Sequence, residues 1–128
     1  MLVYRSDIPA KEDIFEFYEA MGWNKTLKLS AQELLLAMKG SFYGIYVYDD
    51  DKLIATGRLI SDGVTNAYMC GLGVREEYRS HGVGREIINK LSQFTKEHSL
   101  HLQFICGDEV RPYYEKMGFT AFGTGMKL

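Results

Sequence analysis

The chain of 128 residues contains little cysteine, little proline and no long apolar run. Its two cysteines, Cys70 and Cys106, both lie within apolar segments, which is typical of reduced buried thiols and excludes a secreted disulfide scaffold. No stretch approaches the roughly 18 apolar residues of a membrane span, and the N-terminal segment lacks the apolar core of a signal peptide. We therefore expect a soluble, cytoplasmic protein without a membrane partner.

Positive charge is not in excess either. The 15 lysines and arginines are balanced by 17 aspartates and glutamates, for a formal net charge of -2. A nucleic-acid partner thus has no electrostatic support, and any basic site has to be local. Repeats, low-complexity tracts and linkers rich in proline or serine are also absent. We treat residues 1–128 as a single domain, long enough to bury a core.

The first elements along the chain are a strand and a helix. Residues 2–5 read as the strand, and the helix that follows can be capped by Ser6 or Asp7 and ends before Gly22. The apolar residues of this helix share one face: Ile14, Phe17, Tyr18 and Met21. The sequence therefore predicts a helix that packs on a sheet.

A second helix and a hairpin come next. SAQE, residues 30–33, is a capping box that opens the helix, and Gly40 closes it. Residues 42–48 and 53–60 are rich in β-branched and aromatic residues and flank the acidic turn DDDK. This pattern predicts an antiparallel hairpin, with the acidic run as a solvated turn and not as a metal site.

A strand, a helix and a strand follow in that order. The strand covers roughly residues 64–74, and an apolar run at residues 100–106 supplies the other strand. The helix between them carries an apolar stripe: Val83, Ile87, Ile88, Leu91 and Phe94. A βαβ unit places its two strands in parallel, with a right-handed crossover.

The C-terminal segment predicts one more helix and one more strand. Asp108 can cap the helix, Gly118 ends it, and residues 119–126 form the strand. The fold class is α+β, a mixed central sheet flanked by helices in the order β-α-α-β-β-β-α-β-α-β.

The turn that enters the third helix, YRSHGVGREI at residues 78–87, has the features of a phosphate site. The first N–H groups of a helix have no partner inside the helix, and the helix dipole is positive there. Gly82 and Gly84 remove side chains that would keep a phosphate away, while Arg79, His81 and Arg85 add donors. The turn therefore predicts an anion site.

Two better-known phosphate loops do not fit this turn. GK[ST] is missing, which excludes a P-loop, and GxG without a third glycine is a poor dinucleotide fingerprint. A glycine-eased turn between strand and helix remains the structural alternative for the turn taken alone.

The wider segment GLGVREEYRSHGVGREII resembles the acyl-CoA-binding motif of the GNAT superfamily of N-acyltransferases. In that motif a strand ending in valine is followed, after a few residues, by [RQ]xxGx[GA] at the start of a helix. Here the matching residues are Val74, Arg79, Gly82 and Gly84, and RPYYEKMGF at residues 111–119 is similar to the family's FYxKxGF segment. The resemblance implies a GNAT-like sheet and acetyl-CoA as co-substrate.

By this resemblance the coenzyme contacts fall on two segments. Backbone N–H groups of the turn would hold the pyrophosphate: Ser80, His81, Gly82, Val83, Gly84 and Arg85, with Arg79 beside them. Leu72, Gly73 and Val74 would pair with the pantetheine arm where two parallel strands splay apart. Gly71 and Gly73 fit a pantetheine arm at this place independently of the resemblance, since a glycine within a strand often marks a bulge or a close backbone approach. A simple bend of the strand is the alternative.

The resemblance also suggests the catalytic acid. Tyr114 falls on the tyrosine of the FYxKxGF segment, and its phenol can protonate a departing thiolate. A tyrosine packed on the sheet is the alternative, and Tyr113 is expected in the core. The general base is open, because residues 67–73 lack the carboxylate that family members often carry there. Asp108 reads as a helix cap instead.

We thus expect an N-acetyltransferase that moves an acetyl group from acetyl-CoA to a primary amine by direct attack in a ternary complex, without a metal. The acceptor is a small molecule or an amine-bearing peptide, and Arg58 is a candidate partner for its carboxylate or phosphate. A coenzyme A-binding regulatory protein without catalysis is the alternative, and a phosphate-binding module unrelated to coenzyme A is a third reading. The sequence leaves the acceptor, the acyl length and the oligomeric state, including a homodimer, open.

Overall fold

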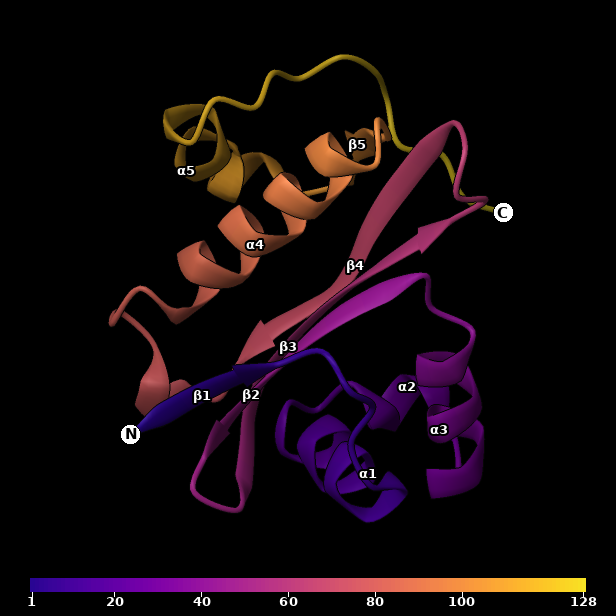
Figure 1. Cartoon of the computed structure of the whole chain (residues 1–128), viewed down its shortest axis with the longest axis vertical. Helices are drawn as coiled ribbons and strands as arrows, with labels where there is room; N and C mark the ends of the chain where they lie inside the picture. Colours follow the sequence, from indigo (N-terminus) through magenta and orange to yellow (C-terminus); the bar gives the residue numbers. More distant parts are fainter.

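A five-stranded sheet runs through the middle of the computed structural model, which describes residues 1–128, and separates two layers of helices (Figure 1). The strands follow the chain in the order β1-β2-β3-β4-β5. Their bounds are Leu2–Arg5 for β1, Tyr43–Asp49 for β2, Lys52–Ser61 for β3, Asn66–Val74 for β4 and His101–Gln103 for β5. The predicted fold class, a mixed sheet flanked by helices, is confirmed.

The helices divide between the two faces of this sheet (Figure 1). One face carries α1 (Lys11–Ala20), α2 (Asn24–Leu27) and α3 (Ala31–Lys39), and the other carries α4 (Val83–Glu97) and α5 (Arg111–Lys116). Short 3-10 turns at Glu76–Tyr78 and Asp108–Val110 precede α4 and α5. None of these helices is both long enough and apolar enough to cross a membrane.

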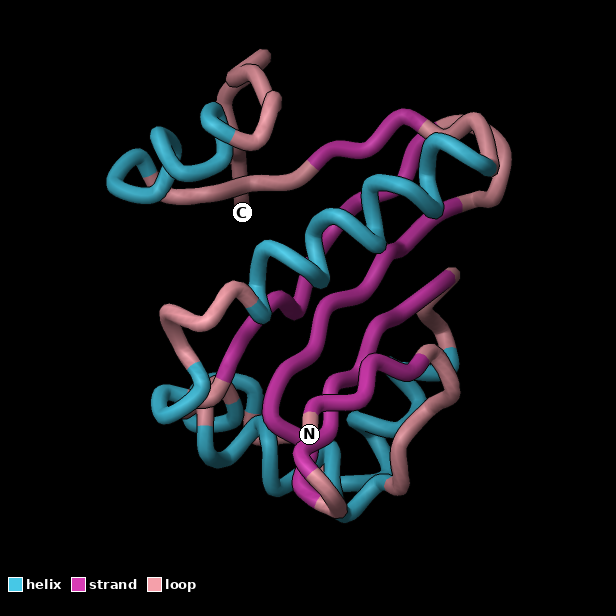
Figure 2. Tube along the Cα trace, turned by 60° about the vertical axis from the view of Figure 1, so that its left-hand side comes forward, coloured by secondary structure: helices cyan, strands magenta, loops and turns pink.

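The sheet is antiparallel from β1 to β4, and β5 joins it in parallel. The predicted hairpin of β2 and β3 and the predicted βαβ unit of β4, α4 and β5 are therefore confirmed. The parallel pairing is short, because it joins only Asn66–Tyr68 to His101–Gln103. Beyond these residues the two chains diverge (Figure 2).

Each face of the sheet buries its own apolar cluster. The aliphatic core, under α4, consists of Ile45, Val47, Ile54, Ala55, Leu59, Ala67, Met69, Val83, Ile87, Ile88, Leu91 and Leu100. The aromatic core, under α1 and α3, consists of Ile14, Phe17, Tyr18, Leu34, Met38, Tyr46 and Leu53. The predicted apolar stripes of α1 and α4 thus face the sheet, although Met21 and Phe94 lie only at the margins.

Local sequence explains where most helices begin and end. The Ser30 Oγ accepts a hydrogen bond from the Glu33 N–H at 3.1 Å, and the Glu33 carboxylate accepts one from the Ser30 N–H at 2.9 Å, so the predicted capping box is present. Gly22 and Gly118 follow α1 and α5 with positive φ angles of 76° and 99°.

Three expectations about the elements are wrong. Neither Ser6 nor Asp7 caps α1, because the helix begins only at Lys11 and Ala10 takes its N-cap position. Asp7 pairs with Arg5 at 2.7 Å instead. Asp108 caps no helix, since neither helical turn after it has a side-chain cap.

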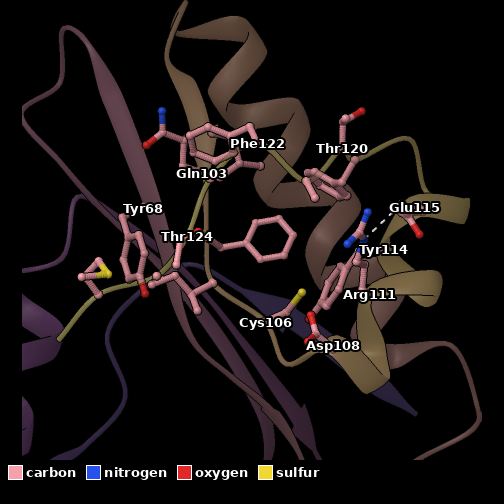
Figure 3. Close-up of a pocket in the computed structure, with 18 residues that line it drawn as sticks. Tyr68, Gln103, Cys106, Asp108, Arg111, Tyr114, Glu115, Thr120, Phe122 and Thr124 are labelled. Carbon is pink, nitrogen blue, oxygen red and sulfur yellow. Dashed lines mark hydrogen bonds and ion pairs between the residues drawn. The ribbon is translucent and has the colours of Figure 1, made fainter.

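The third error is the last strand, because residues 119–126 form no strand. This segment contains Gly123 and Gly125 and is mostly exposed. It runs past α5 and β5 and is separated from β5 by a cavity, so its backbone has no neighbouring strand to pair with (Figures 1 and 3).

Candidate coenzyme site and active site

A bulge distorts β4 halfway along its length. Arg58 of β3 lies opposite Cys70, and Thr56 lies opposite Gly73, so β4 has one residue more than β3 between these pairs. Gly71 within the bulge has a φ of +61°, which favours glycine. The Thr56 hydroxyl donates a hydrogen bond to the Gly71 carbonyl at 2.8 Å and fixes the bulge.

The same stretch of β4 has a free edge. Residues 69–74 pair with β3 on one side, but on the side of β5 the pairing ends at Tyr68. The predicted splay of two parallel strands is therefore present. It leaves the backbone of Leu72, Gly73 and Val74 accessible to another extended chain.

Gly73 has to be a glycine because a side chain on the face of the sheet that carries α1 approaches it closely. A side-chain Cβ at this position would lie 2.5 Å from the Trp23 ring, which comes from the segment between α1 and α2. A close approach at Gly73 is thus present, but the group that approaches is an indole side chain of this chain, so the place of Gly73 beside the pantetheine arm stays a prediction. Trp23 in turn packs edge-on against Phe17 and Tyr18, with ring centroids 5.7 and 5.1 Å apart.

The turn into α4 lies at the end of β4 and leaves a row of donors free. Within the chain, the backbone N–H groups of residues 80–85 have no hydrogen-bond partner, and the first backbone bond of the helix is donated by Glu86. No side chain caps α4. Gly82 takes the N-cap position with a φ of +82° and has no atom within 4 Å of the place where a Cβ would be. An anion can therefore reach these donors.

The side chains around the turn have different tasks. The Arg79 Nε donates a hydrogen bond to the Val74 carbonyl at 2.9 Å and so ties the turn to the end of β4. Val83 is buried in the aliphatic core, so it offers a ligand only its N–H group. Ser80, His81 and Arg85 are exposed. Ser80 also has a φ of +66°.

Two buried or half-buried side chains hold the start of this turn. The Arg75 Nε donates to the Leu53 carbonyl at 2.7 Å, and its Nη2 pairs with Glu16 at 3.3 Å. The Tyr78 hydroxyl donates to the Asp49 carboxylate of the β2–β3 turn. This hydrogen bond lowers the pKa of Asp49. Neither Arg75 nor Tyr78 was singled out in the sequence, because their partners lie far away along the chain.

The tyrosines of α5 occupy two different places. The Tyr113 hydroxyl lies 4.0 Å from the position of a Cβ at Gly84, so this residue reaches the start of α4. It is 41% exposed, and its expected place in the core is therefore wrong. Tyr114 packs against Phe104 and Phe119, with centroids 4.7 and 6.2 Å away. Burial, followed by smaller effects of Cys106 and Tyr113, raises the pKa of Tyr114.

Tyr114 also lines a cavity of about 440 Å³ between β5, α5 and the C-terminal segment (Figure 3). Cys106, Asp108 and Phe122 contribute to its walls. No residue of the stretch 69–85 lines this cavity, so it is distinct from the turn into α4. The phenol is protonated at neutral pH and available as a donor, because its pKa is raised above the usual value.

No carboxylate lies on the stretch that carries the bulge, in agreement with the sequence. Cys70 stands there as a free, half-buried thiol, and burial raises its pKa against an opposing effect of Arg58. A thiol with a raised pKa is a poor nucleophile at neutral pH, which agrees with the expectation of a packed cysteine.

The structure therefore brings the predicted coenzyme residues into one continuous surface. Leu72, Gly73 and Val74 form the free edge, and residues 79–85 form the turn at its end. Tyr114 packs against the margin of the aliphatic core, and its ring centroid lies 5.3 Å from that of Tyr113, which reaches the start of α4. Sequence reasoning missed Trp23 as the cover of Gly73 and Tyr113 as the neighbour of Gly84, and the spacing of aromatic residues gave no signal for either contact.

The fold of this chain recurs in known structures. Among solved structures, a protein of unknown function from meticillin-resistant Staphylococcus aureus superimposes with a TM-score of 0.84 at 23% identity and covers 100% of this chain and 98% of its own. A predicted acetyltransferase from Clostridium acetobutylicum, crystallised with acetyl-CoA, gives 0.71 at 17% identity, with 100% and 96% covered. Glucosamine-6-phosphate N-acetyltransferase from Arabidopsis thaliana gives 0.76 at 15%, with 98% and 97% covered.

At these identities the likeness establishes the fold. No curated protein matches the chain. The family model of the acetyltransferase (GNAT) family, however, matches residues 8–119, which include the bulge, the turn into α4 and both tyrosines of α5. The chain belongs to the GNAT acetyltransferase family.

Proposed function

We propose that the protein transfers an acetyl group from acetyl-CoA to a primary amine by direct attack within a ternary complex. The observation that carries this proposal is the row of free N–H groups at residues 80–85, at the end of a strand whose edge is open. Family membership supports acetyl transfer. One similar structure contains acetyl-CoA and another is an N-acetyltransferase, which supports the donor and the amine.

The residues of the surface fit coenzyme A in two parts. The N–H groups of Ser80 to Arg85 bind the diphosphate, with Arg85 and His81 as additional donors. Arg79 keeps the turn against β4 through its bond to Val74. The backbone of Leu72 to Val74 pairs with the amide groups of the pantetheine arm and so directs the thioester toward the bulge.

The reaction itself exchanges one acyl bond. The lone pair of the neutral amine attacks the thioester carbonyl carbon, a C–N bond forms, and the C–S bond breaks. The nitrogen loses a proton to solvent, and the departing thiolate takes one from the Tyr114 hydroxyl, which solvent protonates again. Positioning of the two substrates contributes about 7 to 11 kcal/mol, and a backbone N–H near Leu72 to Val74 stabilises the oxyanion by about 10² to 10³ in rate.

A coenzyme-binding protein without catalysis is the second candidate. The missing carboxylate at residues 67–73 favours it, because no general base stands beside the bulge. Turnover of acetyl-CoA separates the two candidates: an amine panel screened for acetylated products by mass spectrometry gives product with an enzyme and none with a binding protein.

The coenzyme site is tested at Gly84. A Cβ here would lie 3.8 Å from Val74 and 4.0 Å from the Tyr113 hydroxyl, which are ordinary contacts. Alanine is accepted at the last position of the [RQ]xxGx[GA] motif, so Gly84→Ala should still bind the coenzyme. The larger side chain of Gly84→Val would instead stand among the free N–H groups. Gly82→Val would be less informative, because the φ of +82° strains any side chain.

We expect acetyl-CoA to raise the melting temperature of the wild type, and we expect its apparent affinity for Gly84→Val to be at least tenfold weaker. Gly123→Ala is the control, since this glycine has no atom within 4 Å and lies in the C-terminal segment. Equal coenzyme affinity of all three proteins, or no stabilisation of the wild type, would refute the site.

A further inference from the structure

Arg58 of β3 is a cation that the fold does not neutralise. Its side chain points to the face of α1 and α3, where the Nη1 donates a hydrogen bond to the Ser41 Oγ at 3.1 Å. Its Nε is buried and has no hydrogen-bond partner, and no other side-chain nitrogen or oxygen of the chain is in that state. None of the ion pairs in the chain involves Arg58.

Arg75 shows what a structural arginine looks like on the same face. Its Nε donates to the Leu53 carbonyl at 2.7 Å, its Nη2 pairs with Glu16 at 3.3 Å, and its guanidinium lies 5.7 Å from the Phe17 ring centroid. Arg75 is buried and Arg58 is half-buried, yet only Arg75 has a carboxylate. A partly desolvated charge without a counterion costs free energy, so an anion from outside the chain would stabilise Arg58.

The place of Arg58 relates it to the β4 bulge. A Cβ at Gly71 would lie 3.2 Å from the Arg58 Nε, so the side chain rests directly on the bulge. Two residues further along β4, Trp23 covers Gly73. The guanidinium and the indole therefore both rest on the stretch of β4 toward which the thioester is directed, from the face that carries α1 and α3. A molecule that reacts there can meet a cation and an aromatic ring on this face.

We propose that the acceptor amine carries an anionic group, a carboxylate or a phosphate, close to its nitrogen, and that Arg58 binds this group. The guanidinium suits both anions, because its Nε and Nη donors present a planar fork that two oxygens can accept. The inference rests on the proposed acetyl transfer and narrows its substrate class. Arg58 fixes the acceptor through its anion while the amine reaches the bulge.

Matched acceptors test the proposal on the wild-type enzyme. β-Alanine is compared with β-alaninamide, and phosphoethanolamine with ethanolamine, so that each pair differs by one anionic group. We expect kcat/KM to be at least tenfold higher for the charged member of one pair, and the pair that shows it identifies the anion. Equal values within both pairs, or no turnover of either charged member while neutral amines react, would overturn the inference and leave the acetyltransferase intact.

Variants at Arg58 provide the second test. Arg58→Gln should lose the preference for the charged acceptor through KM, with acetyl-CoA binding unchanged, and Arg58→Lys should recover part of it. Arg5→Gln is the control and should keep the preference for the charged acceptor, because Arg5 is an exposed residue of β1 that already pairs with Asp7. A preference that survives in Arg58→Gln refutes the role of this residue. Should Arg58→Gln fail to fold, the folded Arg58→Lys and the wild-type pairs decide. Failure of acetyl-CoA to bind the wild type would instead refute the proposed function.

Discussion

The two faces of the sheet are built from different side chains, although the same strands form both. The fully buried part of the aliphatic core under α4 contains no aromatic residue, whereas Phe17, Tyr18 and Tyr46 are buried within the aromatic core. Aromatic residues pack against the aliphatic core only at its margin, as Phe94 and Tyr114 do. The two arginines with buried donors, Arg58 and Arg75, both lie on the aromatic side. Under the proposed function, the aliphatic face supports the turn into α4, and the aromatic face carries the groups that would distinguish one acceptor from another.

The largest effect on stability is expected from the aliphatic face. Ile87 of α4 is fully buried in the aliphatic core, so Ile87→Ala removes packing that cannot be replaced and should lower the free energy of unfolding by about 2 to 5 kcal/mol. Leu36→Ala on α3, at a position 58% exposed, is the control and should change it by less than about 0.5 kcal/mol. Urea denaturation measures both, and a loss below 1 kcal/mol at Ile87 would contradict the assigned role of this face.

The next effect concerns the two tyrosines beyond the aliphatic face. Tyr114→Phe removes the proposed proton donor and should lower kcat by about 10² while the affinity for acetyl-CoA stays nearly constant. Tyr113→Phe should instead weaken acetyl-CoA binding while kcat stays nearly constant, because its hydroxyl lies next to Gly84 at the proposed coenzyme turn. Since burial raises the pKa of Tyr114, the phenol stays protonated through pH 9, and the rate should rise with pH as the amine loses its proton. A normal kcat in Tyr114→Phe combined with a low kcat in Tyr113→Phe would make Tyr113, and not Tyr114, the proton donor.

Sequence reasoning reached the features that are local in the chain. The α4 stripe, the Ser30 capping box and the glycines of the turn each depend on neighbours within a few residues, and each is present as expected. The bulge was signalled by Gly71, because few other residues accept its φ angle. By contrast, the orphan Nε of Arg58 depends on β4 and on the end of α3, which no local pattern reveals.

The failed prediction of a last strand has the same origin. Residues 119–126 alternate well enough for a strand, but a strand also needs a neighbour at hydrogen-bonding distance, and the cavity beside β5 removes it. Asp108 failed as a cap because it lies inside the 3-10 turn at residues 108–110, whose N-cap is Gly107, while Val110 takes the N-cap of α5.

A matched pair of glycines compares the two faces directly. A Cβ at Gly57 would lie 2.5 Å from the Ile87 Cγ2, in the middle of the aliphatic core, and a Cβ at Gly73 would lie 2.5 Å from the Trp23 ring. Gly57→Ala should cost about 1 to 3 kcal/mol, because Ile87 has no room to move. Gly73→Ala should cost about 1 kcal/mol, since the half-exposed indole can turn outward and lose only its edge contacts.

Fluorescence gives this comparison a second measurement. Trp23 is the single tryptophan of the chain, so its emission reports on the aromatic face alone. Gly73→Ala should shift the emission to the red, and Gly57→Ala should leave it unchanged. A red shift in Gly57→Ala would mean that the two faces are coupled and would weaken the division of tasks between them.

The smallest effect is expected at the capping box of α3, whose residues Leu34 and Met38 belong to the aromatic core. Ser30→Ala removes a hydrogen bond to the Glu33 N–H and should lower the stability by about 1 kcal/mol at neutral pH.

The pH dependence of the cap comes from Glu33, because the backbone hydrogen bond from Ser30 lowers the pKa of this carboxyl group. The contribution of the carboxylate to stability is therefore complete above its unfolded pKa of about 4.3 and is lost as the pH falls through the folded pKa. Ser30→Ala keeps the backbone N–H that this carboxylate accepts from, so the comparison that isolates the carboxylate is wild type against Glu33→Gln, which can still accept the bond without a charge. The stability difference between these two proteins should shrink below pH 4, and a difference that persists unchanged at pH 3 would show that the charge of the carboxylate does not contribute to the cap.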